Sequence, residues 1–350
     1  MLNIHHIISD GWSIQIITQE LIEIYSALCN GQQIQLKELP IRYVDYASWQ
    51  REWFQDEFLE RELDFWEKSL KGAPSFFSLP TDFPRPSIQT YSGDILHFRV
   101  ERALLDKLRI LSKKNGVSLY TTMLAAFKVL LFKYTGAENI VIGTPTAGRY
   151  RTETEGVVGF FANSLIINTK LSGSMKFNEL LKLIARNTTE AIDNQNVPFE
   201  KMIELVNPMR DLSYSPLFQI FFIFQNRRNS SVIDRVLWEP MEFSNKLSKF
   251  DITLEITEME DYLRASIEYN TDLYLYDTIN NFSKHYINVL ETITQNDEVD
   301  ISHLEYMSKE EYDKILNKWN QTFLEIDFKQ TVHGLFEEQV KRTPMGKALV

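Results

Sequence analysis

The chain has 350 residues, of which 44% are hydrophobic and 24% charged, and this composition predicts a globular protein with a sizeable core rather than a disordered chain. Its 48 acidic and 37 basic residues give a net charge of −11, which argues against a nucleic-acid or anionic-membrane partner. The single cysteine, Cys29, excludes an intrachain disulfide and favours a reducing, cytoplasmic location, and no apolar run approaches the roughly 20 residues that span a bilayer.

The start of the chain predicts a strand, a turn and a helix. Apolar residues over 2–8 indicate a buried strand, and the cluster 9–11 indicates a turn. Apolar residues then recur at three- and four-residue steps from Ile14 to Leu28, which is typical of a helix, and a glycine follows as a stop. Cys29 closes the apolar face of this helix, so we expect a buried structural thiol. A strand at residue 2 needs partners, so we expect the upstream part of a domain to be missing.

Helices dominate the next part of the chain. Residues 44–70 predict one long helix with an aromatic stripe that is expected to pack into a core. The stripe consists of Trp49, Trp53, Phe54, Phe58, Leu63, Phe65 and Trp66. A proline-marked loop leads to an alternating strand at 95–100. Two helices follow, at 104–114 and 119–134, and the second is apolar almost all round, as a core helix is. Ser118 is its expected N-cap and Gly136 its stop.

Strands and helices mix in the remainder of the chain. Short apolar strands at 139–143 and 163–169 flank a loop that carries two arginines. The later expected elements are a helix at 177–192, a central strand at 217–224, a hairpin of strands 249–258 and 262–270, and a helix at 275–295. This order lacks strict alternation, and it predicts an α+β fold with a mixed sheet. We expect a domain over 1–295, a polar and acidic linker over 296–328, and a further segment over 329–350.

The segment 5–11, with the sequence HHIISDG, contains the clearest candidate for chemistry. Adjacent strand residues point to opposite faces, so His6 can enter a cleft while His5 packs behind it. Two such histidines cannot easily share an ion, and no cysteine or further histidine cluster supplies the other ligands, so no metal site is expected. A histidine can exchange a proton at neutral pH, which suits acid–base work. From the residues alone, a core histidine with a purely structural role is the stronger alternative.

Five ordered segments resemble the condensation domains of nonribosomal peptide synthetases. Residues 5–11 resemble the family's HHxxxDG signature, whose core is shared by chloramphenicol acetyltransferase-like acyltransferases. The other segments are 42–50 (RYVDYASWQ), 142–149 with 158–165 (IGTPTAGR and VGFFANSL), 194–200 (NQNVPFE) and 210–219 (RDLSYSPLFQ). Asn194 stands where the family usually has histidine. The order of these segments along the chain makes chance an inadequate explanation.

The resemblance implies a two-lobed, chloramphenicol acetyltransferase-like fold, with its first lobe incomplete here, and an amide-forming reaction. An aminoacyl amine attacks an upstream peptidyl or aminoacyl thioester. Both substrates are attached to 4′-phosphopantetheine arms of upstream and downstream peptidyl carrier domains. No cofactor is expected to bind directly, and an adenylation domain is expected in the same chain. The family's catalytic positions correspond to His6, Asp10 and Gly11, with His6 acting as base or as a group that positions the amine.

The remaining site residues have supporting roles in this interpretation. Asp10 is expected to anchor the structure rather than react, and its charge needs a partner, either Arg149 or an arginine upstream. Gly11 is expected to let the backbone approach the reacting centre, and His5 to act through stability. As candidates for the substrate tunnel we take three amides, which could equally satisfy loop backbone: Asn163, Gln225 and Asn226. A Ser-His-Asp hydrolase built from Ser9, Ser13 and His97 is disfavoured, because no G-x-S-x-G elbow occurs.

Both ends of the chain resemble parts of a larger synthetase. The segment 10–13 (DGWS) resembles condensation domains that take an L-configured donor. Residues 319–322 (WNQT) and 332–339 (VHGLFEEQ) resemble the beginning of an adenylation domain. Because the resemblance implies an upstream segment that forms half of the substrate tunnel wall, we expect residues 1–350 alone to lack condensation activity. Two alternatives remain open: a catalytically inactive fragment that docks carrier domains, and a related acyltransferase.

Overall fold

The computed structural model describes residues 3–53, 56–206, 211–226, 231–233, 236–238, 245–323 and 331–347. It divides into two compact units, Met1–Tyr306 and Met307–Val350. Some sequence predictions lie outside the described residues, namely those for Leu2, Phe54, Arg210 and both ends of the segment 329–350.

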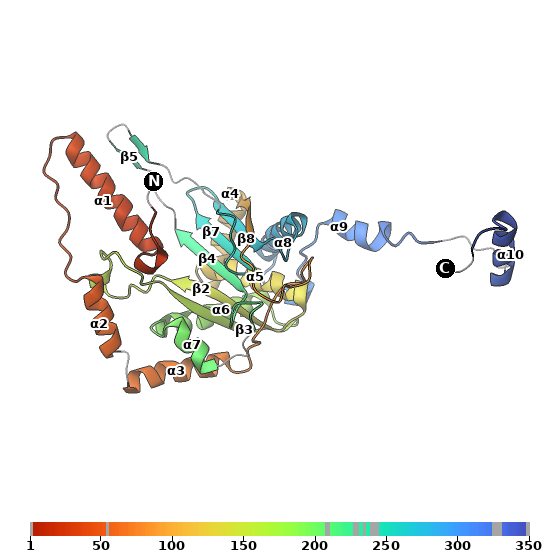
Figure 1. Cartoon of the computed structure of the whole chain (residues 1–350), viewed down its shortest axis with the longest axis horizontal. Coiled ribbons are helices and arrows are strands. Elements are labelled where there is room, and N and C mark those ends of the chain that lie inside the picture. Colours follow the sequence, from red (N-terminus) through yellow and green to blue (C-terminus); the bar gives the residue numbers. More distant parts are fainter. Residues whose placement is uncertain are drawn as a thin grey trace. The chain divides into compact units, whose positions relative to one another are not determined.

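A mixed sheet forms the centre of the first unit (Figure 1). Its strand order is β1-β8-β7-β4-β2-β3; β4 lies parallel to β2 and β7, and the other neighbours are antiparallel. A separate hairpin pairs β5 with β6. The strands are Gly93–Val100 (β1), Asn139–Thr146 (β2), Asn163–Lys170 (β3), Ile220–Asn226 (β4), Ser231–Ile233 (β5), Val236–Trp238 (β6), Ile252–Glu258 (β7) and Leu263–Asn270 (β8). The predicted α+β fold with a mixed sheet is confirmed.

Helices α5, α6 and α8 contact the sheet and α4 packs on these three, so the four form its main covering layer, while α3 and α7 pack together beside β3. Figure 1 shows α1 standing clear of that layer. The helices are Gly11–Cys29 (α1), Tyr43–Trp53 (α2), Asp56–Leu70 (α3), Arg102–Asn115 (α4), Leu119–Thr135 (α5), Phe177–Asp193 (α6), Phe199–Val206 (α7), Tyr276–Gln295 (α8), Lys309–Asp313 (α9) and Val332–Arg342 (α10). Short helical turns occur at His6–Ile8 (η1), Thr152–Thr154 (η2), Ile301–His303 (η3) and Lys314–Lys318 (η4).

Helix α5 is the core helix that the sequence predicts. The Ser118 hydroxyl accepts the Thr121 N–H at its start, and Gly136 ends it in the left-handed conformation. Every residue from Thr121 to Leu131 is buried, including a lysine, Lys128. The Lys128 side-chain nitrogen donates to the Ile140 carbonyl of β2 at 2.9 Å and to the Ile167 carbonyl of β3 at 2.7 Å. Burial holds the pKa of Lys128 well below its usual value.

A tight turn precedes β4 and explains why this strand begins later than predicted. Leu217 has a φ of 70°, and the Phe218 N–H donates to the Pro216 carbonyl at 2.9 Å, which makes a strained γ-turn. The turn lays the Phe218 ring against Gly143 of β2, where a Cβ atom would overlap the ring. Glycine is required at this position because the ring occupies the space of a side chain.

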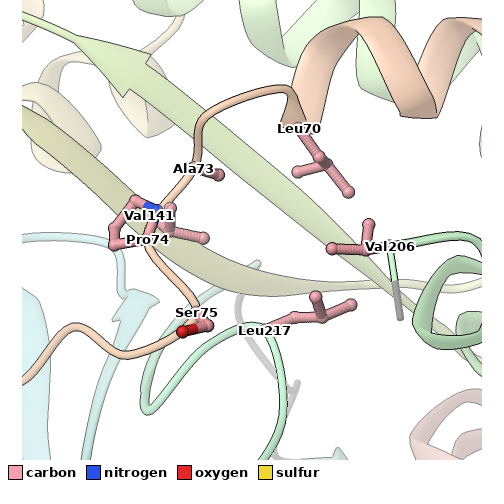
Figure 2. Close-up of a pocket in the computed structure, with 7 residues that line it drawn as sticks. All are labelled: Leu70, Ala73, Pro74, Ser75, Val141, Val206 and Leu217. Atoms are coloured by element: carbon pink, nitrogen blue, oxygen red, sulfur yellow. The ribbon is translucent and has the colours of Figure 1, made fainter. Parts of the chain in front are cut away.

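A small cavity of about 240 Å³ lies beside that turn, and it is lined almost wholly by apolar side chains (Figure 2). Its lining residues come from the end of α3 and the loop after it, from β2, from the end of α7 and from the γ-turn: Leu70, Ala73, Pro74, Ser75, Val141, Val206 and Leu217. None of the sequence-predicted site residues is among them, so the cavity is separate from the candidate site.

The first residues depart from the predicted strand. His6–Ile8 form a 3₁₀ turn, η1, because the His5 Nδ1 atom accepts the Ile7 N–H at 3.1 Å and caps it locally. Of α1 only Ser13 is buried, so its apolar face is exposed or half-buried along its length. Cys29, at the end of that face, is therefore exposed, and the prediction of a buried thiol was wrong.

The expected long helix over 44–70 is two helices, α2 and α3. In α3 the residues that face inward are Glu62, Trp66 and Leu70, one helical turn apart. The Trp66 indole N–H donates to the Asn194 carbonyl at 3.0 Å, which ties α3 to the loop before α7. The aromatic stripe therefore packs into the core in part, as predicted for Trp66.

The first unit extends past α8. The Phe177 and Asn178 N–H groups, at the start of α6, donate to the carbonyls of Val299 and Asp297 at 3.1 and 2.9 Å. Ile301 and Leu304 are buried. Residues 296–306, which the sequence assigned to a linker, thus belong to the first compact unit.

The second unit contains α9, η4 and α10, and its apolar side chains are exposed, with Val332 at 87% and Phe336 at 58%. Across the described part of the chain, no single helix combines the length and apolarity needed to cross a membrane, although the pair α4 and α5, bent by 102°, meets that criterion together.

Candidate active site

The Asp10 carboxylate is the N-cap of α1 and the centre of the candidate site. It accepts the Ser13 N–H and the Ser13 hydroxyl, each at 2.8 Å, and the Phe161 N–H at 3.0 Å. Burial raises the pKa of Asp10, but these hydrogen bonds, followed by the charge of Arg149, outweigh it and hold the pKa below its usual value. Asp10 is therefore a buried, ionised and fully bonded carboxylate.

Arg149 is the partner of Asp10 in this structure. Their side chains lie 3.2 Å apart and are 1% and 3% exposed, and Arg149 also donates to the Ser13 hydroxyl at 3.0 Å. A second guanidinium nitrogen donates to the Val157 carbonyl at 2.7 Å, and the guanidinium carbon lies 4.1 Å from the centre of the Phe161 ring. The pair joins the first turn of α1 to the loop after β2.

The loop segment Gly159–Phe161 is held from two sides. The Ser13 hydroxyl shares its single proton between the Asp10 carboxylate and the Gly159 carbonyl, each 2.8 Å away, and its oxygen accepts the Gly159 N–H at 3.0 Å. From α2, the Tyr43 hydroxyl donates to the Phe160 carbonyl at 2.8 Å. Gly159 itself packs so closely on the Tyr43 ring that a Cβ atom would overlap it. The segment is thus fixed by side chains from α1 and α2.

His6 lies beside this segment with its ring exposed. Its Nδ1 atom is 2.6 Å from the Ser9 carbonyl, so Nδ1 carries the proton and donates it. Because this hydrogen bond places the imidazole proton on Nδ1, Nε2 is left as the acceptor. The Phe160 ring meets the imidazole edge to face, with ring centres 5.1 Å apart. His5, also exposed, caps η1 rather than packing behind a strand.

The other predicted site residues have different surroundings. Nothing lies within 4 Å of a Cβ atom built on Gly11, so no described neighbour demands glycine there. The Asn163 amide donates to the Gln195 and Val197 carbonyls at 3.0 and 2.7 Å, and its oxygen accepts the Phe199 N–H. Asn163 therefore satisfies loop backbone, the alternative that the sequence left open. Gln225 and Asn226 are the last residues of β4.

Sequence reasoning assigned no site role to three residues that build the site: Ser13, Tyr43 and Phe160. Each lies within a motif segment, but the motif does not show which side chain bonds to which backbone group. A local signal existed for Ser13, because it stands at the third helical position after an aspartate N-cap.

Among the residues that the structure describes, no cluster of three or more His, Cys, Asp or Glu side chains could hold a metal ion.

The sequence profile of the condensation domain matches residues 1–316. The chain belongs to the condensation-domain family. It is 40% identical over its whole length to a linear gramicidin synthase of Brevibacillus parabrevis, and 37% identical to gramicidin S synthase 2 of Aneurinibacillus migulanus. It spans only 7% and 8% of the length of these relatives.

Solved condensation-domain structures share the fold. A four-domain nonribosomal peptide synthetase bound to AMP and glycine superposes on 88% of the chain with a TM-score of 0.80 at 26% identity, and the chain covers 24% of it. The first condensation domain of the calcium-dependent antibiotic synthetase superposes on 87% of the chain with a TM-score of 0.71 at 16% identity, and 66% of it is covered. The predicted condensation fold is confirmed, and so is the family that the motifs indicate: condensation domains of nonribosomal peptide synthetases, which form amide bonds.

Proposed function

We propose that the first unit catalyses amide formation between an upstream peptidyl or aminoacyl thioester and a downstream aminoacyl thioester, with His6 as the catalytic residue. Family membership supports the reaction class. The observation that carries the proposal is the state of the His6 ring: its Nδ1–H is engaged by the Ser9 carbonyl, and its exposed ring presents Nε2 as an acceptor. A neutral imidazole in this tautomer can accept a proton or a hydrogen bond from an amine.

The chemistry matches what Nε2 offers. The amine nitrogen attacks the thioester carbon, the C–N bond forms and the C–S bond breaks, so the thiol of the upstream arm leaves. The amine loses one proton, which passes to His6 Nε2 and from there to the departing sulfur. If Nε2 instead only accepts a hydrogen bond, it orients the amine lone pair toward the carbon. In both cases the role of Asp10 and Arg149 is to hold the structure around His6.

We also propose the partners that this reaction needs. The thioesters arrive on phosphopantetheine arms of two carrier domains, and the DGWS segment after the histidines favours an L-configured donor. The condensation profile ends at residue 316, whereas the relatives align with the chain along its full length. This supports the proposal that the segment 329–350, with α10, is the beginning of an adenylation domain in a larger synthetase.

A chimera tests the proposal. Residues 1–316 would replace the matching segment of the linear gramicidin synthase, and amide product would be measured from two loaded carrier domains. We expect product from the chimera and at least tenfold less from its His6→Ala variant, because a positioned general base contributes about 10²–10⁴ in rate. A folded chimera that gives no product, or whose His6→Ala variant is fully active, contradicts the proposal.

A docking module is the second candidate. The X-domain from teicoplanin biosynthesis has been solved in complex with OxyB, and it superposes on 87% of the chain with a TM-score of 0.76 at 25% identity. A relative of this fold can therefore serve as a binding partner. A chimera that binds both carrier domains and forms no product would favour docking over catalysis.

A further inference from the structure

Few described contacts hold the His6 ring in place, so each of them affects its orientation. The ring is exposed, and its described polar contact is the Ser9 carbonyl at Nδ1. That bond fixes one atom of the imidazole but leaves rotation about the bond open. The Phe160 ring, meeting the imidazole at 83° and 5.1 Å, supplies the second point of contact.

Phe160 is 42% exposed, so its own side chain gives it limited anchorage. Its place depends on its backbone. The residues on either side are tied to α1, Gly159 through the Ser13 hydroxyl and Phe161 through Asp10. The carbonyl of Phe160 itself is held by α2, through the Tyr43 hydroxyl at 2.8 Å.

We infer that Tyr43 is a positioning residue for His6: its hydroxyl fixes the Phe160 backbone, and the Phe160 ring fixes the orientation of the imidazole. The inference rests on the proposed function for its catalytic meaning. Burial and then the nearby Asp10 charge raise the pKa of Tyr43, so its hydroxyl remains protonated and keeps donating. Tyr43, on α2, would thus act on the reacting groups through His6 rather than by touching them.

The hydroxyl can be tested apart from the ring. The Tyr43 ring packs on Gly159 and meets the Phe161 ring edge to face at 5.1 Å, so Tyr43→Phe keeps these contacts and removes only the hydrogen bond. A matched control is Tyr286→Phe in α8. Its hydroxyl also donates to a backbone carbonyl, that of Met123 at 3.0 Å, but it lies in the main core.

The first measurement uses the full 350-residue chain and needs no turnover. Histidine-selective ¹⁵N and ¹³C labelling gives ring signals for the six histidines, and a His6→Gln spectrum assigns His6. We expect Tyr43→Phe and Phe160→Leu to shift the His6 ring signals, and Tyr286→Phe to leave them in place. The double variant should match Phe160→Leu alone, because Tyr43 acts through Phe160. Unmoved His6 signals in a Tyr43→Phe chain with a lowered melting temperature would show a merely structural role.

The second measurement uses the chimera. We expect Tyr43→Phe to lower the rate of amide formation about tenfold, since misplacing a catalytic group by 1 Å can cost about 10²-fold. Phe160→Tyr, which keeps an aromatic ring, should retain activity that Phe160→Leu loses. Full activity of Tyr43→Phe overturns the inference. An inactive wild-type chimera counts against the proposed function instead, and the spectra of the full chain still decide the inference.

Discussion

The Asp10 carboxylate joins segments that are far apart in the sequence while meeting all of its own hydrogen-bonding needs. It caps α1, accepts the Phe161 N–H and pairs with Arg149, and each of these bonds is shielded from water. A buried ion pair contributes little net stability when complete but is costly to break, because the remaining charge loses its solvent and its partner together.

We therefore predict that Asp10→Asn and Arg149→Ala each destabilise the protein by about 3–5 kcal/mol. Asparagine is itself a good N-cap, so the loss reflects the Arg149 pair rather than the start of α1. Urea unfolding of both single variants and the double variant measures this. The loss of stability in the double variant should be clearly smaller than the sum of the two single losses. Simple additivity would mean that the two charges do not depend on each other.

His6 and His5 form a natural pair of variants. His6→Ala should lower amide formation in the chimera at least tenfold with an unchanged melting temperature, because the exposed ring contributes chemistry and little packing. His5→Ala removes the acceptor of the Ile7 N–H and should cost roughly 1 kcal/mol or less, with activity retained. Equal losses of activity in the two variants would contradict this division.

At the scale of elements, the γ-turn before β4 and the middle of β2 depend on each other. Phe218 is 1% exposed, and its ring occupies the space that a side chain at Gly143 would need. The motif segments 142–149 and 210–219 therefore meet in space, although nothing in either segment alone indicates it.

We predict that Gly143→Ala destabilises the protein by about 1–3 kcal/mol, the usual range for overpacking a core. Gly11→Ala is the control, because its Cβ atom would meet open space. Adding Phe218→Leu to Gly143→Ala should recover part of the loss, and thermal unfolding of the four chains measures it. A harmless Gly143→Ala would show that the ring can move aside.

The buried Lys128 of α5 makes the stability of the protein depend on pH. Its pKa is lowered by burial, so between that value and the unfolded value of about 10.4 the unfolded chain binds a proton that the folded chain lacks. Stability should then rise with pH across this window, by up to about 1.4 kcal/mol per unit, and Lys128→Met should flatten the rise. Urea midpoints from pH 7 to about 9.5 measure it, with the exposed Lys107→Met as control. Parallel curves for the wild type and Lys128→Met would show that the buried ammonium stays charged.

At the scale of the whole molecule, the candidate site lies on a small core of its own. Tyr46, Val157 and Phe161 form a cluster distinct from the main core around α5 and the sheet. The site is thus built where α2 and the loop after β2 meet the first turn of α1.

That arrangement explains what the sequence could and could not predict. Local signals located α5, with its Ser118 cap and Gly136 stop, because both act within one turn of the helix. The contacts of Tyr43 with Phe160 depend on tertiary approach, which periodicity does not encode. The strand predicted over 2–8 was wrong because an apolar run also fits a capped turn, and the capping side chain, His5, was assigned a different role.

The boundary between the two units leads to the last prediction. Residues 296–306 are bonded to the start of α6 and bury Ile301 and Leu304, whereas Trp319 is 64% and Phe323 90% exposed. Limited proteolysis should therefore cut first after Tyr306, at sites between about 307 and 323, and leave a stable core that retains the whole of 296–306. Mass spectrometry of the products locates the cuts. Early cleavage between 296 and 306 would contradict the boundary. We expect α10 to be cut earlier than α8, because its exposed apolar side chains bury too little surface to offset the roughly 1–2 kcal/mol of backbone ordering entropy per residue. Protection of α10 for as long as α8 would also contradict the boundary.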